Sequence, residues 1–150
     1  MLLIRITLKL NSKTNNFEYI KEIKKLIKKR SKTMNEEQLE LWKNLKEGNT
    51  LGEVQEYIRK VIGIRGFSNQ SIEQTMLLLT EEIGELAKAI RKEKTTMSID
   101  NNKIRNYDTI ESEVADVFIV LCTICNKLDI DLFSSLKDKE KENIERKWKK

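Results

Sequence analysis

Two short acidic motifs hold the residue types best suited to chemistry in this sequence. Glu82 and Glu85 form the first motif, and Glu113 and Asp116 form the second, after a gap of 27 residues. In an α-helix, residues three positions apart lie on one face, with Cβ atoms roughly 5–6 Å apart. Each motif therefore places two carboxylates side by side, as a shared cation would require.

Bringing these four acidic groups together has a predictable energetic consequence. They repel one another, and uncompensated burial costs several kcal/mol per ion, so either several are protonated or a cation offsets them. The sequence has no His, and ligation by oxygen alone selects a hard ion, Mg²⁺ or Mn²⁺. Magnesium held by carboxylates keeps positions open that phosphate oxygens fill well. Two ions roughly 3.5–4 Å apart would also activate water for in-line attack on phosphorus. Any one of these acids alone would be read as an ordinary surface residue, but the joint pattern favours a site.

Two amphipathic helices must position the motifs. The first is expected from about Ser71 to Lys92, and the second should be opened by an N-terminal cap at Asp108. Their apolar residues follow the same 4-3-4-3-4 spacing, which predicts that the two helices pack as neighbours in a bundle. The stripes are Ile72, Met76, Leu79, Ile83, Leu86 and Ile90 in the first helix, and Ile110, Val114, Val117, Leu121, Ile124 and Leu128 in the second.

The carboxylates lie in rows beside these stripes, next to Leu78 and Ala89 in the first helix and Val120 in the second. Both the stripe and the carboxylate row need cover, and so small a monomer cannot provide it for both. This predicts an obligate homo-oligomer.

The rest of the chain is also expected to be helical, because it has no Pro and only five Gly. One helix is predicted over residues 16–31 and a shorter one over residues 35–46. Thr50 and Glu53 have the form of a capping box and should open a helix that ends at the turn of residues 65–69. Asp131 should cap a last helix that runs to the C-terminus. Residues 1–10 alternate with strand period but have no partner strand in the sequence.

The net charge of +5 is concentrated near the N-terminus. Residues 1–49 hold 12 Lys or Arg against 6 Asp or Glu, whereas the remainder holds 17 against 18. Lysines crowd one face of the predicted helix over residues 16–31. A nucleic-acid or membrane-surface patch is one interpretation, but no aromatic residues are interleaved with the lysines and no known binding motif accompanies them. We therefore expect a solvated face that binds neither nucleic acid nor membrane.

Other sequence features bear on compartment and redox chemistry. No apolar run is long enough to cross a membrane, and the N-terminal residues do not resemble a secretory signal. With only two Cys, this favours the cytoplasm. Cys122 and Cys125 form a C-x-x-C pattern inside a predicted helix, without a second Cys pair or His. We interpret them as small packing residues and not as a redox or zinc motif.

At the acidic motifs the sequence resembles the MazG-like family of all-α nucleotide pyrophosphohydrolases. Residues 79–86 (LTEEIGEL) look like the L-x-E-E-x-G-E-L helix of that family, and residues 113–117 (EVADV) look like its E-x-A-D-V. Two weaker features agree, namely an Arg-Gly-Phe turn that ends at Phe67 and a K-x-x-x-N-x-x-R pattern. The latter is formed by Lys139, Asn143 and Arg146. The resemblance covers about residues 50–148.

The resemblance implies a four-helix bundle over residues 49–150, assembled as a homodimer or homotetramer, with residues 1–48 as a basic helical extension of unknown function. It implies cleavage of a nucleoside triphosphate into the monophosphate and pyrophosphate, with Mg²⁺ as cofactor. Metal ligands would be Glu82, Glu85, Glu113 and Asp116. Glu81 and Glu82 would act in catalysis, and Lys139, Asn143, Arg146 and Phe67 would contact the substrate.

Two alternatives stay open at this stage. A pyrimidine-specific dUTP/dCTP hydrolase, or a phosphoribosyl-ATP pyrophosphohydrolase, would share the metal chemistry and differ in the base pocket. A non-catalytic helical module would instead use the basic helix over residues 16–31 to engage nucleic acid, with the acidic helices mediating assembly.

Overall fold

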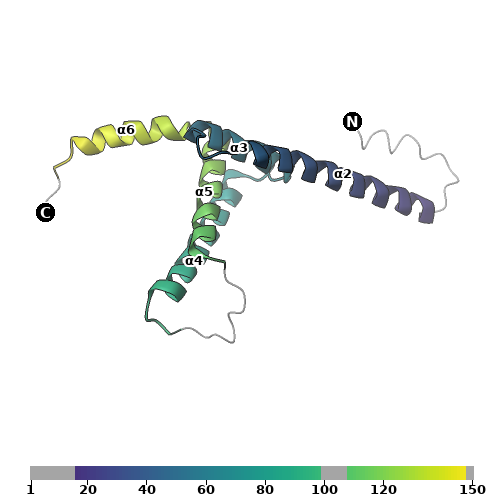
Figure 1. The fold of residues 1–150 in the computed structure, drawn as a ribbon, viewed down its shortest axis with the longest axis horizontal. Helices are drawn as coiled ribbons and strands as arrows, with labels where there is room; N and C mark the ends of the chain where they lie inside the picture. Colours follow the sequence, from purple (N-terminus) through teal and green to yellow (C-terminus); the bar gives the residue numbers. More distant parts are fainter. Residues whose placement is uncertain (1–15, 99–107, 148–150) are drawn as a thin grey trace. The chain divides into compact units, whose positions relative to one another are not determined.

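The computed structural model describes residues 16–98 and 108–147, and every regular element in these ranges is an α-helix. The all-α prediction is confirmed for this part of the chain. The strand-like segment 1–10 and most of the predicted loop over residues 95–107 lie outside the described residues. The helices (Figure 1) are α2 (Asn16–Asn44), α3 (Leu51–Ile64), α4 (Ile72–Lys94), α5 (Ile110–Lys127) and α6 (Leu132–Ile144).

Helix α2 is continuous, where the sequence pattern predicted two helices. No Gly or Pro interrupts it, and the Thr33 hydroxyl donates to the Lys29 carbonyl oxygen at 3.0 Å, within the helix. The chain divides into two compact units, Met1–Trp42 and Lys43–Lys150. Helix α2 supplies all the described residues of the first unit, and helices α3 to α6 belong to the second.

The helix starts follow the capping chemistry of the sequence. At α3 the predicted capping box is present, because the Glu53 amide donates to the Thr50 hydroxyl and the Thr50 amide donates back to the Glu53 carboxylate. Asp131 caps α6 as predicted, accepting from the Ser134 amide at 2.6 Å. The cap of α5 is Thr109, not Asp108, so this prediction was wrong by one residue.

In the second unit, α5 packs against both α4 and α3, and α3 also packs against α6. A buried amide ties the ends of three helices together. The Gln55 amide nitrogen donates to the Asn126 side-chain oxygen at 3.1 Å and to the Ile130 carbonyl at 2.7 Å. The Leu132 amide donates to the Gln55 side-chain oxygen at 3.1 Å. These bonds fix the start of α6 against α3 and α5.

A lysine of α5 anchors the turn between α3 and α4. Lys127 donates from its ammonium group to the carbonyl oxygens of Ser68 and Gln70, at 3.1 and 2.8 Å. Gly66 has φ = +84°, a conformation that residues with a side chain rarely adopt. With α3 anchored through Gln55 and α4 through this turn, the start of α4 is positioned relative to the end of α5.

Helices α4 and α5 are neighbours, as the matched stripes predicted, but the stripes form only part of the packing face. Thr75 and Ala89 of α4 are fully buried, and Glu82 lies midway between them on the same row. Of the predicted apolar stripe, Ile83 stays 51% exposed and Val114 50% exposed. The two helices therefore meet in large part through the carboxylate rows, and every second residue of each apolar stripe is exposed. Within the described ranges, no helix combines the length and apolar character needed to span a membrane.

Candidate metal centre

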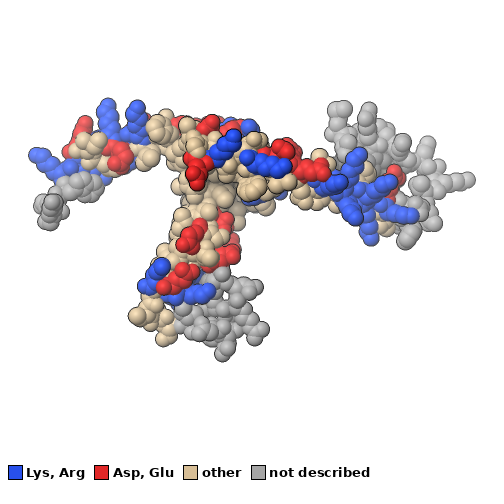
Figure 2. Space-filling model, in the orientation of Figure 1, with Lys and Arg blue, Asp and Glu red and all other residues tan. Residues whose placement is uncertain are grey.

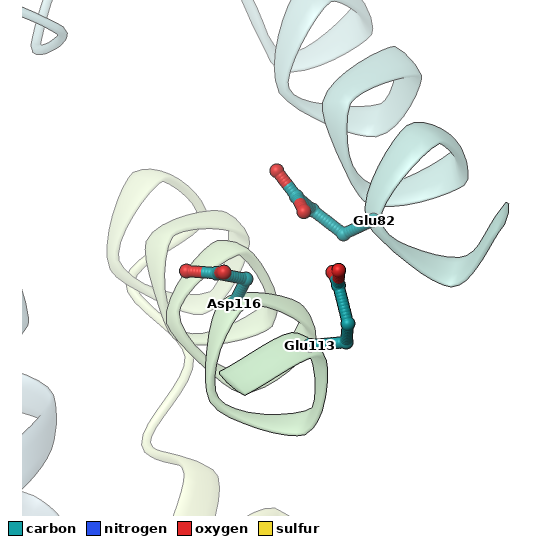
Figure 3. A group of neighbouring side chains, drawn as sticks. All are labelled: Glu82, Glu113 and Asp116. Carbon is teal, nitrogen blue, oxygen red and sulfur yellow. The ribbon is translucent and has the colours of Figure 1, made fainter. Parts of the chain in front are cut away.

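Three of the predicted acidic residues come together between α4 and α5. One carboxylate oxygen from each of Glu82, Glu113 and Asp116 lies within 4.8 Å of the others. Figure 3 shows the Glu82 side chain extending from α4 towards the two acidic residues on α5. Glu113 is buried, with 5% of its surface exposed, and the other two are partly buried. The pairing of motifs that are 27 residues apart in sequence is thus produced by the packing of the helical hairpin.

The row that holds these residues faces inward because of its neighbours. Thr75 and Ala89 lie seven residues before and after Glu82, and both are fully buried. The Thr75 hydroxyl donates to the Ser71 carbonyl oxygen at 2.9 Å, so this polar group can be buried with its hydrogen bond satisfied. Small side chains on both sides of Glu82 let α5 approach α4 closely, which brings Glu113 and Asp116 within reach.

Burial and like charges raise the pKa values of two of these groups. The pKa of Glu82 lies above its ordinary value, first through desolvation and then through the negative charges of Asp116 and Glu113. The pKa of Glu113 is also raised, again first by desolvation, with Asp108 and Glu85 as the next causes. Both shifts show that negative charge is unfavourable here. A cation bound between the two helices would remove that cost.

The other two predicted catalytic or metal-binding acids lie at the edge of this group. Glu85 does not join the three clustered carboxylates. It is ion-paired with Lys88, one turn further along α4, and both side chains are partly exposed. Glu81 precedes Glu82 and is exposed, although its charge contributes to the raised pKa of Glu82. The sequence predicted no role at the site for Lys88, and for Asp108 only a helix cap, yet the charges of these two residues act on the pKa of Glu113 in opposite directions. Their positions in the sequence, three residues after Glu85 and five before Glu113, were the signal that could have linked them to the acidic motifs.

The residues predicted to contact the substrate do not lie among the three clustered carboxylates. Lys139 and Asn143 lie on α6, which packs mainly against α3, and each bonds to a glutamate one turn away. Lys139 pairs with Glu142 at 2.6 Å, and the Asn143 side-chain amide donates to Glu140 at 2.7 Å. Arg146 follows the end of α6 and is exposed, and Phe67 is 45% exposed in the turn between α3 and α4.

The C-x-x-C pair is packing, as the sequence predicted. Cys122 and Cys125 are free thiols, both buried within α5. Burial raises the pKa of Cys122 to about 11, which keeps this thiol protonated at neutral pH and therefore poorly nucleophilic.

Fold and site together define an all-α protein with a carboxylate-only candidate metal site on a helical hairpin. Comparison with known families gives the family itself. The model of the MazG nucleotide pyrophosphohydrolase domain matches residues 70–148, which include α4, α5 and α6 and make up more than half of the chain. The protein therefore belongs to the MazG nucleotide pyrophosphohydrolase family. Searches of curated proteins and of solved structures gave no match.

Proposed function

We propose that the protein hydrolyses nucleoside triphosphates between the α- and β-phosphates, releasing the nucleoside monophosphate and pyrophosphate. The observation that carries this proposal is the convergence of Glu82, Glu113 and Asp116 on one point between α4 and α5. Membership of the MazG family indicates the class of reaction, and the three clustered carboxylates are a site where a metal ion could bind for that reaction.

The residues present fit a hard divalent cation. Only carboxylate oxygens meet at the site, and such donors favour Mg²⁺, with Mn²⁺ as a substitute. When bound, the ion would neutralise phosphate charge and polarise the phosphorus for attack by water. Glu82, Glu113 and Asp116 would hold it directly. Glu85 would complete the set by exchanging its ion pair with Lys88 for the metal.

Two neighbouring glutamates would handle the attacking water. As a ligand of the ion, Glu82 would also lie beside a water molecule bound to that ion, where its second carboxylate oxygen could accept a proton. Glu81 lies beside it in the chain and is exposed, which suits a group that orients water at the edge of the site. For the substrate, Lys139, Asn143 and Arg146 would contact phosphate oxygens, and Phe67 would contact the nucleoside.

We further propose that the working form is a homo-oligomer, a dimer or a tetramer. Three residues of α4 spaced by seven are 41–51% exposed, and three on α5 with the same spacing are 39–51% exposed. Since α4 and α5 lie side by side, these rows form one apolar face, of the kind that rarely stays uncovered. It consists of Met76, Ile83, Ile90, Val114, Leu121 and Leu128. Docking of two such hairpins would complete a four-helix bundle built from residues 49–150, with residues 1–48 as an extension.

Pyrophosphate release from a panel of ribo- and deoxyribonucleoside triphosphates, with and without Mg²⁺, tests the proposed function. We expect release that depends on Mg²⁺ and yields the monophosphate. Turnover restricted to dUTP and dCTP would identify a pyrimidine-specific hydrolase on the same scaffold. No turnover of any nucleotide at saturating Mg²⁺ would contradict catalysis and favour a non-catalytic helical module.

A further inference from the structure

Helix α2 carries an apolar row of its own, outside the residues that match the MazG family. Four apolar residues follow one another at intervals of seven, namely Ile20, Ile27, Met34 and Leu41. Ile20 is 47% exposed and Ile27 is 62% exposed, while the other two are half-buried. A seven-residue repeat kept over such a length is the signature of a helix that packs along another helix.

A second row borders the first and is interrupted by two opposite charges. Ile23, Arg30 and Glu37 lie three residues after successive members of the apolar row, so they flank the same seam. The side chains of Arg30 and Glu37 are exposed. In a parallel pair of α2 helices each charge would meet its own copy, which is repulsive. In an antiparallel pair that sets Ile27 level with Glu37 of the other copy, Arg30 lies within about 4.5 Å of that Glu37 along the helix axis, close enough for an ion pair between these long side chains. The two-fold axis would repeat the contact.

The overall charge along α2 favours the same orientation. Seven basic residues and one acidic residue, Glu22, occur between positions 21 and 32, whereas positions 33–42 hold Glu36, Glu37 and Glu40 and no basic residue. Figure 2 shows the Lys and Arg side chains gathered on the N-terminal half. An antiparallel partner with the same sequence would place its acidic half beside this basic half. A second copy of α2 is therefore complementary in both its apolar row and its charge.

We propose that α2 pairs in antiparallel orientation with α2 of a second copy of this chain, through the row of Ile20, Ile27, Met34 and Leu41. Reciprocal contacts between Arg30 and Glu37 set the orientation. This interface is separate from the apolar face of α4 and α5 and does not rest on the proposed enzymatic activity. It gives residues 16–44 a role in assembly.

Charge exchange in the full-length protein tests the pairing. Arg30→Glu leaves two acids in the flanking row and Glu37→Arg leaves two bases, so each variant should repel itself. We expect the dissociation constant for this association, measured by sedimentation on dilution, to rise about tenfold in each single variant. The double exchange Arg30→Glu/Glu37→Arg, and an equimolar mixture of the two single variants, should both return to the wild-type value. The face of α4 and α5 is identical in all four proteins, so any difference among them reports on α2.

The same proteins separate self-pairing from an anionic partner. If α2 instead bound anionic vesicles of phosphatidylcholine and phosphatidylglycerol, or duplex DNA, Glu37→Arg would tighten binding and Arg30→Glu would weaken it. Equal masses for all four proteins, with opposite shifts in vesicle or DNA binding, would overturn the proposal. Equal masses without any such shift would also overturn it.

A parallel pair is excluded if Ile20→Cys chains cross-link to Leu41→Cys chains by a short bis-maleimide, while neither variant cross-links to itself.

Discussion

Adjacent residues of α4 differ sharply in burial within a single copy of the chain. Thr75, Glu82 and Ala89 form the row that packs against α5, whereas the next residue in each case, Met76, Ile83 and Ile90, is 41–51% exposed. The row that carries the Glu82 carboxylate is thus inside, and a row of large apolar side chains is outside, which is unusual for a surface helix. Helix α5 repeats the contrast at Glu113, which is buried, and Val114, which is half exposed.

This arrangement separates two tasks that one helix must perform. An inward row that contains carboxylates is costly without a cation, so it points to a ligand. An outward row of large apolar side chains is costly in water, so it points to another protein surface. The two rows are one residue apart, and the same helix can therefore serve a metal site and an interface at once. Substitutions in each row should have separable effects.

The largest effect should come from the inward row. Glu82→Gln, Glu113→Gln and Asp116→Asn should each lower pyrophosphate release by roughly two orders of magnitude or more, because each removes a charge that holds the cation. Glu85→Gln should do the same if Glu85 joins the metal. EDTA should also abolish turnover of the unaltered protein, and added Mg²⁺ should restore it.

Glu93→Gln is the matched control, since it makes the same change at an exposed position of the same helix. Its rate should equal that of the unaltered protein. Full turnover in EDTA, or full turnover by the double variant Glu82→Gln/Glu85→Gln, would contradict the metal hypothesis.

The next largest effect should come from the outward row. Ile83→Asp puts a charge in the centre of the apolar face, where docking would desolvate it. We expect the dissociation constant for oligomerisation, measured by sedimentation at micromolar concentration, to rise about 100-fold, a change typical of disrupting a residue at the centre of an interface.

Leu77→Asp is the control for this row. Leu77 is 71% exposed, more than Ile83, but helical spacing places it away from the face shared with α5. Association should be unchanged by this substitution. A compact, active monomer of 17.7 kDa in the unaltered protein would refute the assignment of the whole face.

A smaller effect is expected on α6, which belongs to neither row. Lys139→Gln and Arg146→Gln should each raise KM for the nucleotide by about tenfold, because each removes one charged hydrogen bond to a phosphate. The affinity for Mg²⁺, measured by titration calorimetry, should not change. Lys141→Gln, on the same helix, serves as the control. Unchanged KM in both variants would restrict the substrate site to α4 and α5.

The smallest effect concerns stability without metal. Glu113→Gln removes one of the mutually repelling groups, so the melting temperature of the metal-free protein should stay the same or rise by a few degrees. A sharp fall on calorimetry would instead indicate that Glu113 has a structural ion-pair role.

The same groups predict a pH dependence of stability. Glu82 and Glu113 have folded-state pKa values above the ordinary value of 4.5, so the folded protein binds protons that the unfolded chain has already released. Stability of the metal-free protein should therefore fall as pH rises from 4.5 through these raised values. The fall should be shallower in Glu113→Gln, and saturating Mg²⁺ should reverse it.

Several features of this protein were predictable from the sequence because they depend on local chemistry. The capping box of Thr50 and Glu53, the cap at Asp131 and the helical spacing of α4 and α5 each involve residues within a few turns of one another. The spacing of Glu113 and Asp116 likewise places both acids on one face of α5. Local rules erred by one residue at Thr109, where two adjacent side chains could both have capped the helix.

Tertiary packing decided what periodicity could not. Apolar stripe and carboxylate row run side by side along α4, and the sequence favoured the stripe as the packing face because it is the more hydrophobic. The small residues Thr75 and Ala89 on the carboxylate row are instead fully buried, Glu82 lies near Glu113, and Ile83 stays exposed. The distance between two helices depends on side-chain size at the contact, and hydrophobicity alone does not encode it. Glu85, which matches Glu82 in the motif, instead pairs with Lys88 one turn along the same helix and lies outside the three clustered carboxylates.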